Sequence, residues 1–254
     1  MLWARIRHGG RTLGGAVEGE SFRVHAGDPF AGASPTGETI PLAEAEWLTP
    51  CQPSKLIGLW NNFRAAAEKN AWALPPEPLY FIKGANSYCA HLQTVQAPAS
   101  YDGRVFYEGE LGVVIGRRCK AVSVEEAAAC IFGYTCVNDV TPFEIIGRDA
   151  SFAQWSRAKS FDTFGVFGPM IATDLDPMGL TVRTLVNGRE RQNYPVSDMI
   201  FPPAELVSRI SRDMTLEPGD VIACGTSLGV LPLKPGTTVE VAIEGIGVLR
   251  NEYR

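Results

Sequence analysis

The alternation of apolar and polar residues along the chain indicates strands more often than helices. Five runs are β-branched or alternate with a period of two, which is the period of a strand that buries one face. These runs are Val105 to Ile115, Met170 to Thr173, Leu180 to Val186, Val221 to Cys224 and Thr238 to Ile243. The last two follow Pro-Gly turns. We therefore predict a mainly β protein without a regular alternation of strands and helices.

Helical patterns are few and irregularly spaced. Strong helix formers fill the stretch from Asn61 to Trp72. Ser123 and Glu126 form a capping-box pattern, and the alanine-rich run that follows extends to Gly133. A third helix is predicted from Pro203 to Met214, because its apolar residues recur on one face after a proline in the first turn.

The N-terminal fifty residues differ in composition from the rest of the chain. They are rich in glycine and turn formers, and residues 2 to 7 alternate between aliphatic side chains and Trp or Arg. Pro50 and Pro53 then interrupt the chain, since proline disfavours helix before it and removes a backbone donor. We predict a small strand-rich N-terminal region over residues 1–52, followed by a larger domain over residues 53–254.

Composition excludes several classes of function. The 254 residues carry a net charge of −5 and no run of Lys or Arg, which argues against nucleic-acid binding. No apolar run approaches the roughly 20 residues of a membrane span, and Arg5 and Arg7 interrupt any signal-peptide core. We expect a cytoplasmic protein that binds neither nucleic acid nor membrane. The six cysteines form no CxxC pair, which predicts reduced, buried thiols.

Histidine is scarce, and this limits the chemistry that is available. The chain has only His8, His25 and His91, and none is near another in the sequence. Such spacing excludes a multi-histidine zinc site within one chain and leaves at most one isolated catalytic histidine. Chemistry must therefore depend on carboxylates, on lysine or on a metal held by oxygen atoms.

Glu108 and Glu110 are the most informative acids in the chain. In a strand, the period of two places both carboxylates on one face, within a segment that continues almost wholly apolar. Two like charges at this spacing repel each other, and a hard divalent cation such as Mg²⁺ is a natural partner for their oxygens. The alternative is a solvated edge strand whose glutamates face water.

Two further residues bear on such a site. Asp139 stands where the strand-like segment 133–137 ends, so it could complete an oxygen site, although an Asx turn is the commoner use of Asn-Asp. Lys159 lies among aromatic residues. A partly desolvated lysine beside a metal could orient an anionic substrate or move a proton, whereas the simpler interpretation is an amphipathic surface side chain.

These motifs, taken in order, resemble those of the fumarylacetoacetate hydrolase superfamily over about residues 55 to 254. Those that carry the resemblance are Glu108-Gly-Glu110-Leu-Gly, Gly133-Tyr134 with Asn138-Asp139, Trp155 with Ala158-Lys159-Ser160, Val186-Asn187-Gly188 with Arg191-Gln192, Leu216-Glu217-Pro218-Gly219-Asp220, Gly225-Thr226 and Glu244-Gly-Ile-Gly247. Each motif alone is loose, but the ordered set is specific.

The resemblance implies a mixed β-roll catalytic domain that assembles as a homodimer. It assigns Mg²⁺ or Mn²⁺ to Glu108, Glu110 and Asp139, makes Lys159 the active-site lysine and places Thr226 beside the substrate. The implied substrate is a small 2-oxo acid. The leading reaction is hydrolysis of a C–C bond in an acylpyruvate through a metal-stabilised enolate. Isomerisation or decarboxylation of a 2-hydroxydienedioate on the same site is the alternative.

The sequence departs from the family pattern at two places. Glu68 occupies the position of the glutamate in a water-activating His-Glu dyad and is expected to be catalytic, but Ala65 stands where the histidine would be. His91 is the one candidate replacement.

Phe143 stands where many members have an anion-binding arginine, so we expect it to contact a substrate with an apolar or differently charged tail. Isomerisation and decarboxylation need no activated water and suit the missing histidine. A metal-binding relative without catalytic activity is the second alternative.

Overall fold

The computed structural model describes residues 1–254 and is mainly β. Its strands are β1 Leu2–His8, β2 Arg11–Glu18, β3 Ser21–Ala26, β4 Ser34–Pro41, β5 Glu46–Trp47, β6 Leu56–Trp60, β7 Leu79–Lys83, β8 Tyr88–Cys89, β9 Thr94–Val95, β10 Gly109–Ile115, β11 Ile131–Asp139, β12 Gly165–Ala172, β13 Thr181–Val186, β14 Arg189–Pro195, β15 Val221–Ala223, β16 Thr237–Ile243 and β17 Gly247–Tyr253. The helices are α1 Arg64–Lys69, α2 Val124–Ala128, α3 Phe143–Ile146, α4 Trp155–Lys159 and α5 Pro203–Asp213. The predicted fold class is confirmed.

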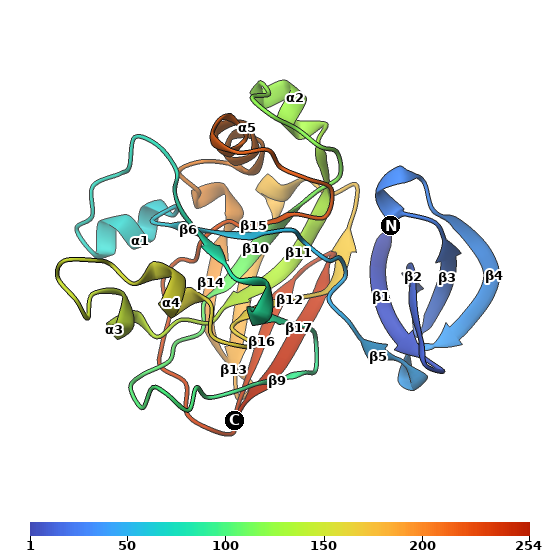
Figure 1. Ribbon diagram of the computed structural model, residues 1–254, viewed down its shortest axis with the longest axis horizontal. Coiled ribbons are helices and arrows are strands. Elements are labelled where there is room, and N and C mark those ends of the chain that lie inside the picture. The colour runs from blue at the N-terminus through green and yellow to red at the C-terminus, as the bar shows by residue number, and fades with distance from the viewer.

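One large sheet runs through both predicted regions. Its main path is β4-β3-β2-β1-β12-β11-β10-β15-β6-β7, so the N-terminal strands join the rest of the sheet where β1 pairs with β12. Figure 1 shows these strands as a blue group beside the remainder of the molecule. Trp3 of β1 is buried opposite Ile171 of β12, in a cluster that also contains Val114, and this packing supports the attachment. Both faces of β1 are partly buried, because Trp3 is buried on the face opposite the aliphatic side chains.

A five-stranded sheet, in the order β14-β13-β16-β17-β9, packs on the larger one. Leu111 and Val113 of β10 share one cluster of 41 buried residues with Val182 of β13 and Val241 of β16. Most neighbouring strands are antiparallel, but β15 runs parallel to β6 and β12 parallel to β8. The result is the mixed β-roll that the sequence motifs predicted.

The three predicted helices form, and one ends earlier than expected. α1 and α5 lie within the predicted ranges, and Ser123 accepts a hydrogen bond from the Glu126 amide as the capping box requires. The extension of the second helix to Gly133 was wrong, because α2 ends at Ala128 and Gly133 lies inside β11. A Cβ at Gly133 would stand 2.4 Å from the Ala172 carbonyl oxygen, so glycine is there for close strand contact.

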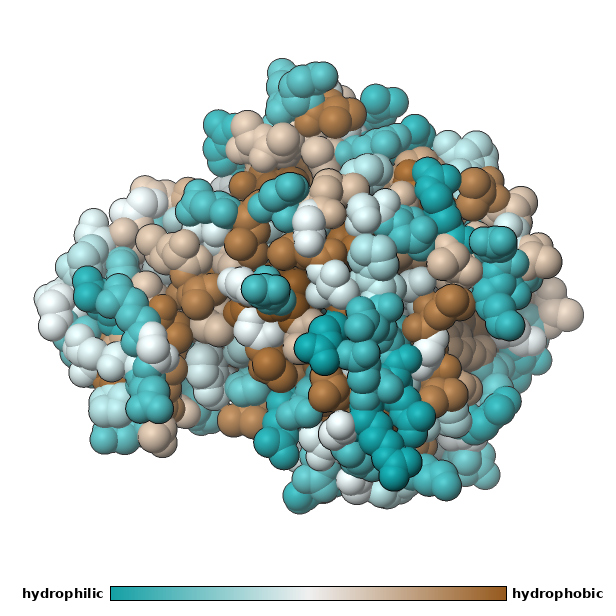
Figure 2. Space-filling view, turned by 180° about the vertical axis from the view of Figure 1, so that it is seen from behind, coloured by the Kyte–Doolittle hydropathy of each residue, from teal (hydrophilic) through white to brown (hydrophobic).

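The short helices α3 and α4 were missed. They contain four and five residues, which is too short for a helical repeat to show in the sequence. Figure 1 places them beside α1, on the side of the molecule away from the N-terminal strands. In the opposite view, a hollow edged by hydrophobic side chains opens on the half of the molecule away from those strands (Figure 2).

Two predictions about the chain as a whole can be compared with the structure. All six cysteines are unpaired and buried, as predicted. None of the helices has both the length and the apolar character needed to cross a membrane.

The capping box at α2 gives a direct test of local stability. Ser123→Ala removes the hydroxyl that accepts from the Glu126 amide, so we expect a loss of about 1 kcal/mol in unfolding free energy. Thermal or urea unfolding measures it. Ser34→Ala, at an exposed position of β4, is the control and should change the free energy little. An equal loss in both variants would contradict the capping role.

Candidate active site

Three acidic side chains meet where β10 begins and β11 ends. Glu108 directly precedes β10, Glu110 is its second residue, and Asp139 is the last residue of β11. The Asp139 amide donates to the Glu108 carbonyl oxygen at 2.9 Å, which sets the two strands in register. One carboxylate oxygen of each acid lies within 4.8 Å of the others. The same-face placement expected of Glu108 and Glu110 is therefore present.

The acids are not a solvated edge. Glu108, Glu110 and Asp139 are 4%, 1% and 1% exposed, and β10 lies between β11 and β15 inside the large sheet. The alternative in which the glutamates face water was wrong. The Asx-turn alternative for Asp139 also fails, because its carboxylate is bound by buried lysines rather than by the local backbone.

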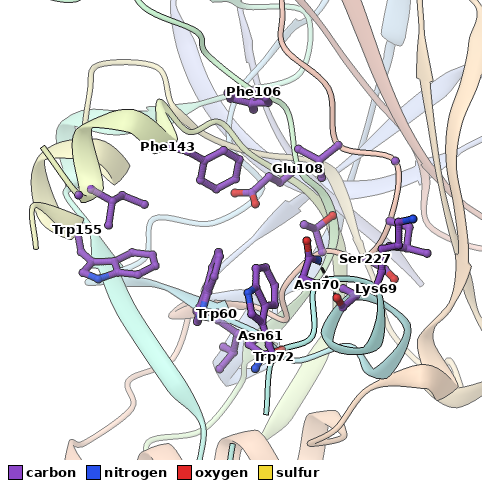
Figure 3. Close-up of a pocket in the computed structure, with 18 residues that line it drawn as sticks. Trp60, Asn61, Lys69, Asn70, Trp72, Phe106, Glu108, Phe143, Trp155 and Ser227 are labelled. Atoms are coloured by element: carbon purple, nitrogen blue, oxygen red, sulfur yellow. Dashed lines mark hydrogen bonds between the residues drawn. The ribbon is translucent and has the colours of Figure 1, made fainter. Parts of the chain in front are cut away.

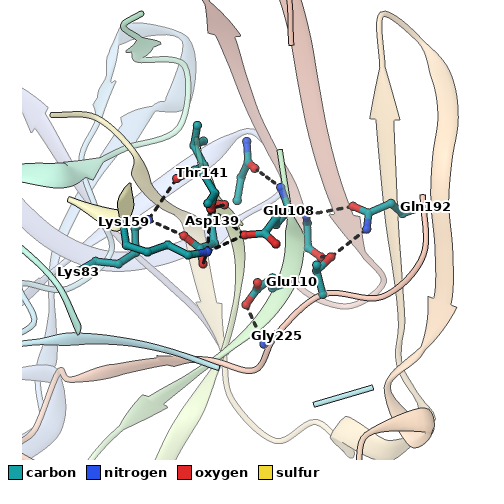
Figure 4. A network of polar contacts seen from close by, with 12 residues as sticks. Lys83, Glu108, Glu110, Asp139, Thr141, Lys159, Gln192 and Gly225 are labelled. Atoms are coloured by element: carbon teal, nitrogen blue, oxygen red, sulfur yellow. Dashed lines mark hydrogen bonds and ion pairs between the residues drawn. The ribbon is translucent and has the colours of Figure 1, made fainter. Parts of the chain in front are cut away.

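Two buried lysines approach the acids from different elements. Lys159, the last residue of α4, donates to Glu108 Oε2 at 2.7 Å, to Asp139 Oδ2 at 2.6 Å and to Thr141 Oγ1 at 2.7 Å (Figure 4). Lys83, the last residue of β7, donates to Asp139 Oδ1. Both lysines are at most 2% exposed, so the surface interpretation of Lys159 was wrong.

Lys83 was missed by the sequence analysis. It stands in a strand whose residues are apolar on both faces, so its inward direction cannot be read from the pattern. The only signal was that Lys83 lies two residues after Phe81 and therefore on the same face of the strand. The structure was needed to show that this face is buried.

The lysines are distributed unequally over the acids. Burial opposes ionisation of Asp139, but Lys159 and Lys83 outweigh it and hold its pKa below the usual value. Glu110 contacts neither lysine and accepts one hydrogen bond, from the Gly225 amide at 2.8 Å. Burial, together with the charges of Asp139 and Glu108, raises the pKa of Glu110 well above its usual value. Three acids face two lysines, and Glu110 is the acid without a cation.

The donor set fits a hard divalent cation. All three residues offer carboxylate oxygens, which Mg²⁺ and Mn²⁺ prefer. Glu108 Oε1 and Glu110 Oε1 accept no hydrogen bond, whereas both oxygens of Asp139 are bound by lysine. A cation on these oxygens would neutralise the charge that the lysines leave uncompensated. Glu108, Glu110 and Asp139 are thus the residues that would hold it.

A second polar network braces the start of β10. Gln192 of β14 accepts from the Gly109 amide at 3.0 Å and donates to Thr226 Oγ1 at 2.8 Å. Thr226 in turn donates to the Gly109 carbonyl oxygen at 2.9 Å. Gly109 separates the two glutamates, so this network fixes the strand on which both are carried (Figure 4).

A cavity of about 620 Å³ opens above Glu108. Of the expected substrate-contacting residues, both Phe143 and Thr226 line it. Ser227 and Asn61 also line the cavity, and Ser227 Oγ and Asn61 Oδ1 are buried without a hydrogen-bond partner.

The structure does not bring Glu68 into this cavity. Its side chain is exposed on α1, while Ala66 and Lys69 of the same helix line the cavity. Ala65 stands on this helix as well, so α1 supplies no histidine.

His91 does not replace the missing histidine, and the hypothesis that it does was wrong. Its Nδ1 accepts from the Arg250 amide, and its ring packs on Trp47 at 5.4 Å between centroids. Burial, and then the Arg250 charge, lowers its pKa to about 4. His91 therefore joins the N-terminal strands to β17 rather than lining the cavity.

A mixed β-roll with a buried carboxylate–lysine cluster below an open cavity is the class of protein to which the sequence motifs pointed. Residues 55–254 match the family model described as fumarylacetoacetate (FAA) hydrolase C-terminal, and the chain belongs to this enzyme family. Residues 1–50 match the model described as Rv2993c-like, N-terminal.

Several relatives resemble the chain over most of its length. An uncharacterized protein of Archaeoglobus fulgidus is 45% identical over 85% of this chain and 84% of its own. A 2-hydroxyhepta-2,4-diene-1,7-dioate isomerase from Mycobacterium marinum has a TM-score of 0.91 at 38% identity, over 100% and 98% of the two chains. A maleylpyruvate hydrolase from Sphingobium sp. SYK-6, in complex with manganese (II) and pyruvate, has a TM-score of 0.81 at 25% identity, over 100% and 98%. The relatives thus include both hydrolases and isomerases.

Gly109→Ala tests the brace at β10. A Cβ there would stand 2.0 Å from Thr184 Oγ1 and 3.1 Å from Gln192 Oε1, so the strand or both partners must move. We expect a melting temperature lower by several degrees and weaker Mn²⁺ binding by calorimetry. Gly147→Ala is the control, because nothing lies within 4 Å of its Cβ. Adding Thr184→Ala should recover part of the loss, and no recovery would contradict the steric explanation.

Glu110→Gln tests the uncompensated acid. The amide keeps the shape of the carboxyl group and cannot ionise, so the variant avoids the cost of burying an acid beside two other carboxylates and should melt at a higher temperature than the wild type in EDTA. Excess Mn²⁺ should stabilise the wild type and stabilise the variant much less. Differential scanning fluorimetry in both buffers measures this. The idea fails if the two proteins respond equally to Mn²⁺.

Proposed function

We propose that this protein is a divalent-cation-dependent enzyme that acts on a small 2-oxo acid by stabilising its enolate. The observation that carries the proposal is the buried cluster of Glu108, Glu110 and Asp139, opening through Glu108 into a cavity. Its geometry suits Mg²⁺ or Mn²⁺, and a relative is described with manganese and pyruvate. When bound, such a cation supplies a Lewis acid for the carboxylate and 2-oxo oxygens of the substrate.

The residues of the chain provide the other functions that this chemistry needs. Lys159 remains charged, since Asp139 and Glu108 outweigh burial and raise its pKa. It therefore orients Glu108 and Asp139 and presents a fixed positive charge near developing negative charge. Thr226 and Ser227 offer hydroxyl groups at the cavity wall, and Phe143 offers an apolar surface for the remainder of the substrate.

The positions of the histidines bear on the choice of reaction. Hydrolysis of a C–C bond needs an activated water, and the cavity contains no histidine while Glu68 lies outside it. Hydrolysis with Glu68 as the base therefore requires α1 to move so that Glu68 enters. Isomerisation of a 2-hydroxydienoate, or decarboxylation, needs a stabilised enolate and proton transfer only. Within our proposal, the present geometry favours isomerisation or decarboxylation, and hydrolysis is the candidate that depends on movement of α1.

The non-catalytic alternative accounts poorly for Lys159 and Lys83. A structural metal site gains nothing from two buried ammonium groups that compete with the cation for Asp139. The homodimer implied by the resemblance and the cytoplasmic location expected from the sequence belong to the same proposal. Light scattering of the purified protein tests the dimer.

A substrate panel tests the activity. We expect Mn²⁺- or Mg²⁺-dependent turnover of at least one of three classes, namely acylpyruvates, oxaloacetate and 2-hydroxydienedioates, and its loss in EDTA. Lys159→Gln should lower kcat by about a hundredfold or more, because the charge that orders the acids is removed. Lys234→Gln, at an exposed position, should leave kcat unchanged. If none of the three classes shows metal-dependent turnover, the result would support the non-catalytic alternative.

A further inference from the structure

Aromatic side chains form one wall of the cavity. Trp60 at the end of β6, Trp72 after α1 and Trp155 at the start of α4 all line it. The Trp60 ring lies 4.7 Å from Trp72 and 5.4 Å from Trp155 between centroids. Trp60 and Trp72 flank α1, and Trp155 comes from a distant part of the sequence. Together they form one group of indole rings, which we call the tryptophan wall.

The tryptophan wall begins next to the acid cluster. Trp155 stacks on Phe81 at 5.5 Å and an interplanar angle of 15°, and the Phe81 ring lies 4.5 Å from Lys159 Nζ. On the other side, the Phe143 ring lies 5.8 Å from the same ammonium group. Figure 3 shows Trp60, Trp72, Trp155 and Phe143 around a space on one side of the Glu108 carboxylate. A group held at Glu108 would therefore extend into aromatic surroundings.

The charges around the cavity do not favour an anionic tail. Among its 18 lining residues the only charged side chains are Glu108 and Lys69. Lys69 is exposed at the end of α1, and Figure 3 shows it on the opposite side of Glu108 from Trp155. A carboxylate placed against the tryptophan wall would lose its hydration without gaining a cation, whereas a flat apolar ring would gain contact with indole faces.

From this arrangement we propose that the tryptophan wall binds the tail of the substrate and selects 2-oxo acids that carry an aromatic ring over those that carry a second carboxylate. This inference rests on the proposed function, because the 2-oxo acid head is taken to bind at the acid cluster. Trp60 and Trp72 are the specificity-determining residues. Trp155 has a further part, since it begins the helix that ends at Lys159.

Isothermal titration with three stable ligands tests the inference on the Mn²⁺-loaded protein. The ligands are phenylpyruvate, pyruvate and 2-oxoglutarate, which share the head and differ in the tail. We expect phenylpyruvate to bind about tenfold or more tightly than either of the others. Oxalate serves as a probe of the head site alone.

Two variants assign the preference to the wall. Trp72→Ala and Trp60→Leu should each reduce the preference for phenylpyruvate severalfold and leave oxalate binding unchanged. Trp47→Ala is the matched control, because Trp47 packs on His91 and does not line the cavity. Lys69→Gln should leave the affinity for 2-oxoglutarate unchanged, since Lys69 is not expected to bind the tail. Circular dichroism and light scattering confirm that each variant keeps its fold and oligomeric state.

The outcomes separate the inference from the function on which it rests. If oxalate and all three 2-oxo acids fail to bind in the presence of Mn²⁺, the proposed function is wrong. If oxalate binds but 2-oxoglutarate binds as tightly as phenylpyruvate, the function stands and the aromatic preference is overturned. The assignment of the preference to the tryptophan wall is overturned if Trp72→Ala and Trp60→Leu keep their fold and leave the ligand ratios as they were.

Discussion

The burial of three neighbouring carboxylates is the constraint on which the rest of the site depends. Like charges of this kind cannot remain ionised in a protein interior unless cations face them. Two lysines meet this need for Asp139 and Glu108, and neither reaches Glu110. Glu110 is therefore the acid whose ionised form a divalent cation would compensate. Without a cation, burial of this acid beside two other carboxylates is a cost to folding.

The fold supplies the rigidity that such a cluster requires. The acids stand at the start of β10 and the end of β11, and both strands lie inside the large sheet with a neighbour on each side. The lysines come from β7 and α4, so the positive charges are held by separate elements that converge on the same point. The network from Gln192 to Gly109 adds the smaller sheet to this support. The position of the acids therefore depends on the packing of the two sheets. For this reason we expect a methyl group at Gly109 to weaken metal binding.

The floor and the walls of the cavity above the cluster differ in chemistry. Its floor contains Glu108, one of the acids that the family motifs implied, and its walls are largely aromatic. Phe143 and the tryptophan wall are apolar where an anion-binding arginine was the family expectation. Ala65 and the exposed Glu68 likewise leave the cavity without a water-activating dyad. These departures are the basis for the reaction and the substrate tail that we propose.

The amino-acid sequence was sufficient to predict the fold class, the position of α5 and the capping box of α2, because these depend on local periodicity and on side chains a few residues apart. It also identified Glu108, Glu110 and Asp139 as a cluster, since the strand period and the ordered motifs both point to them. Three features could be seen only in the tertiary structure. Lys83 binds Asp139, His91 does not line the cavity, and Trp155 joins Trp60 and Trp72 in one wall. These residues are brought together by strand pairing and helix packing over long sequence separations. No local pattern records such contacts.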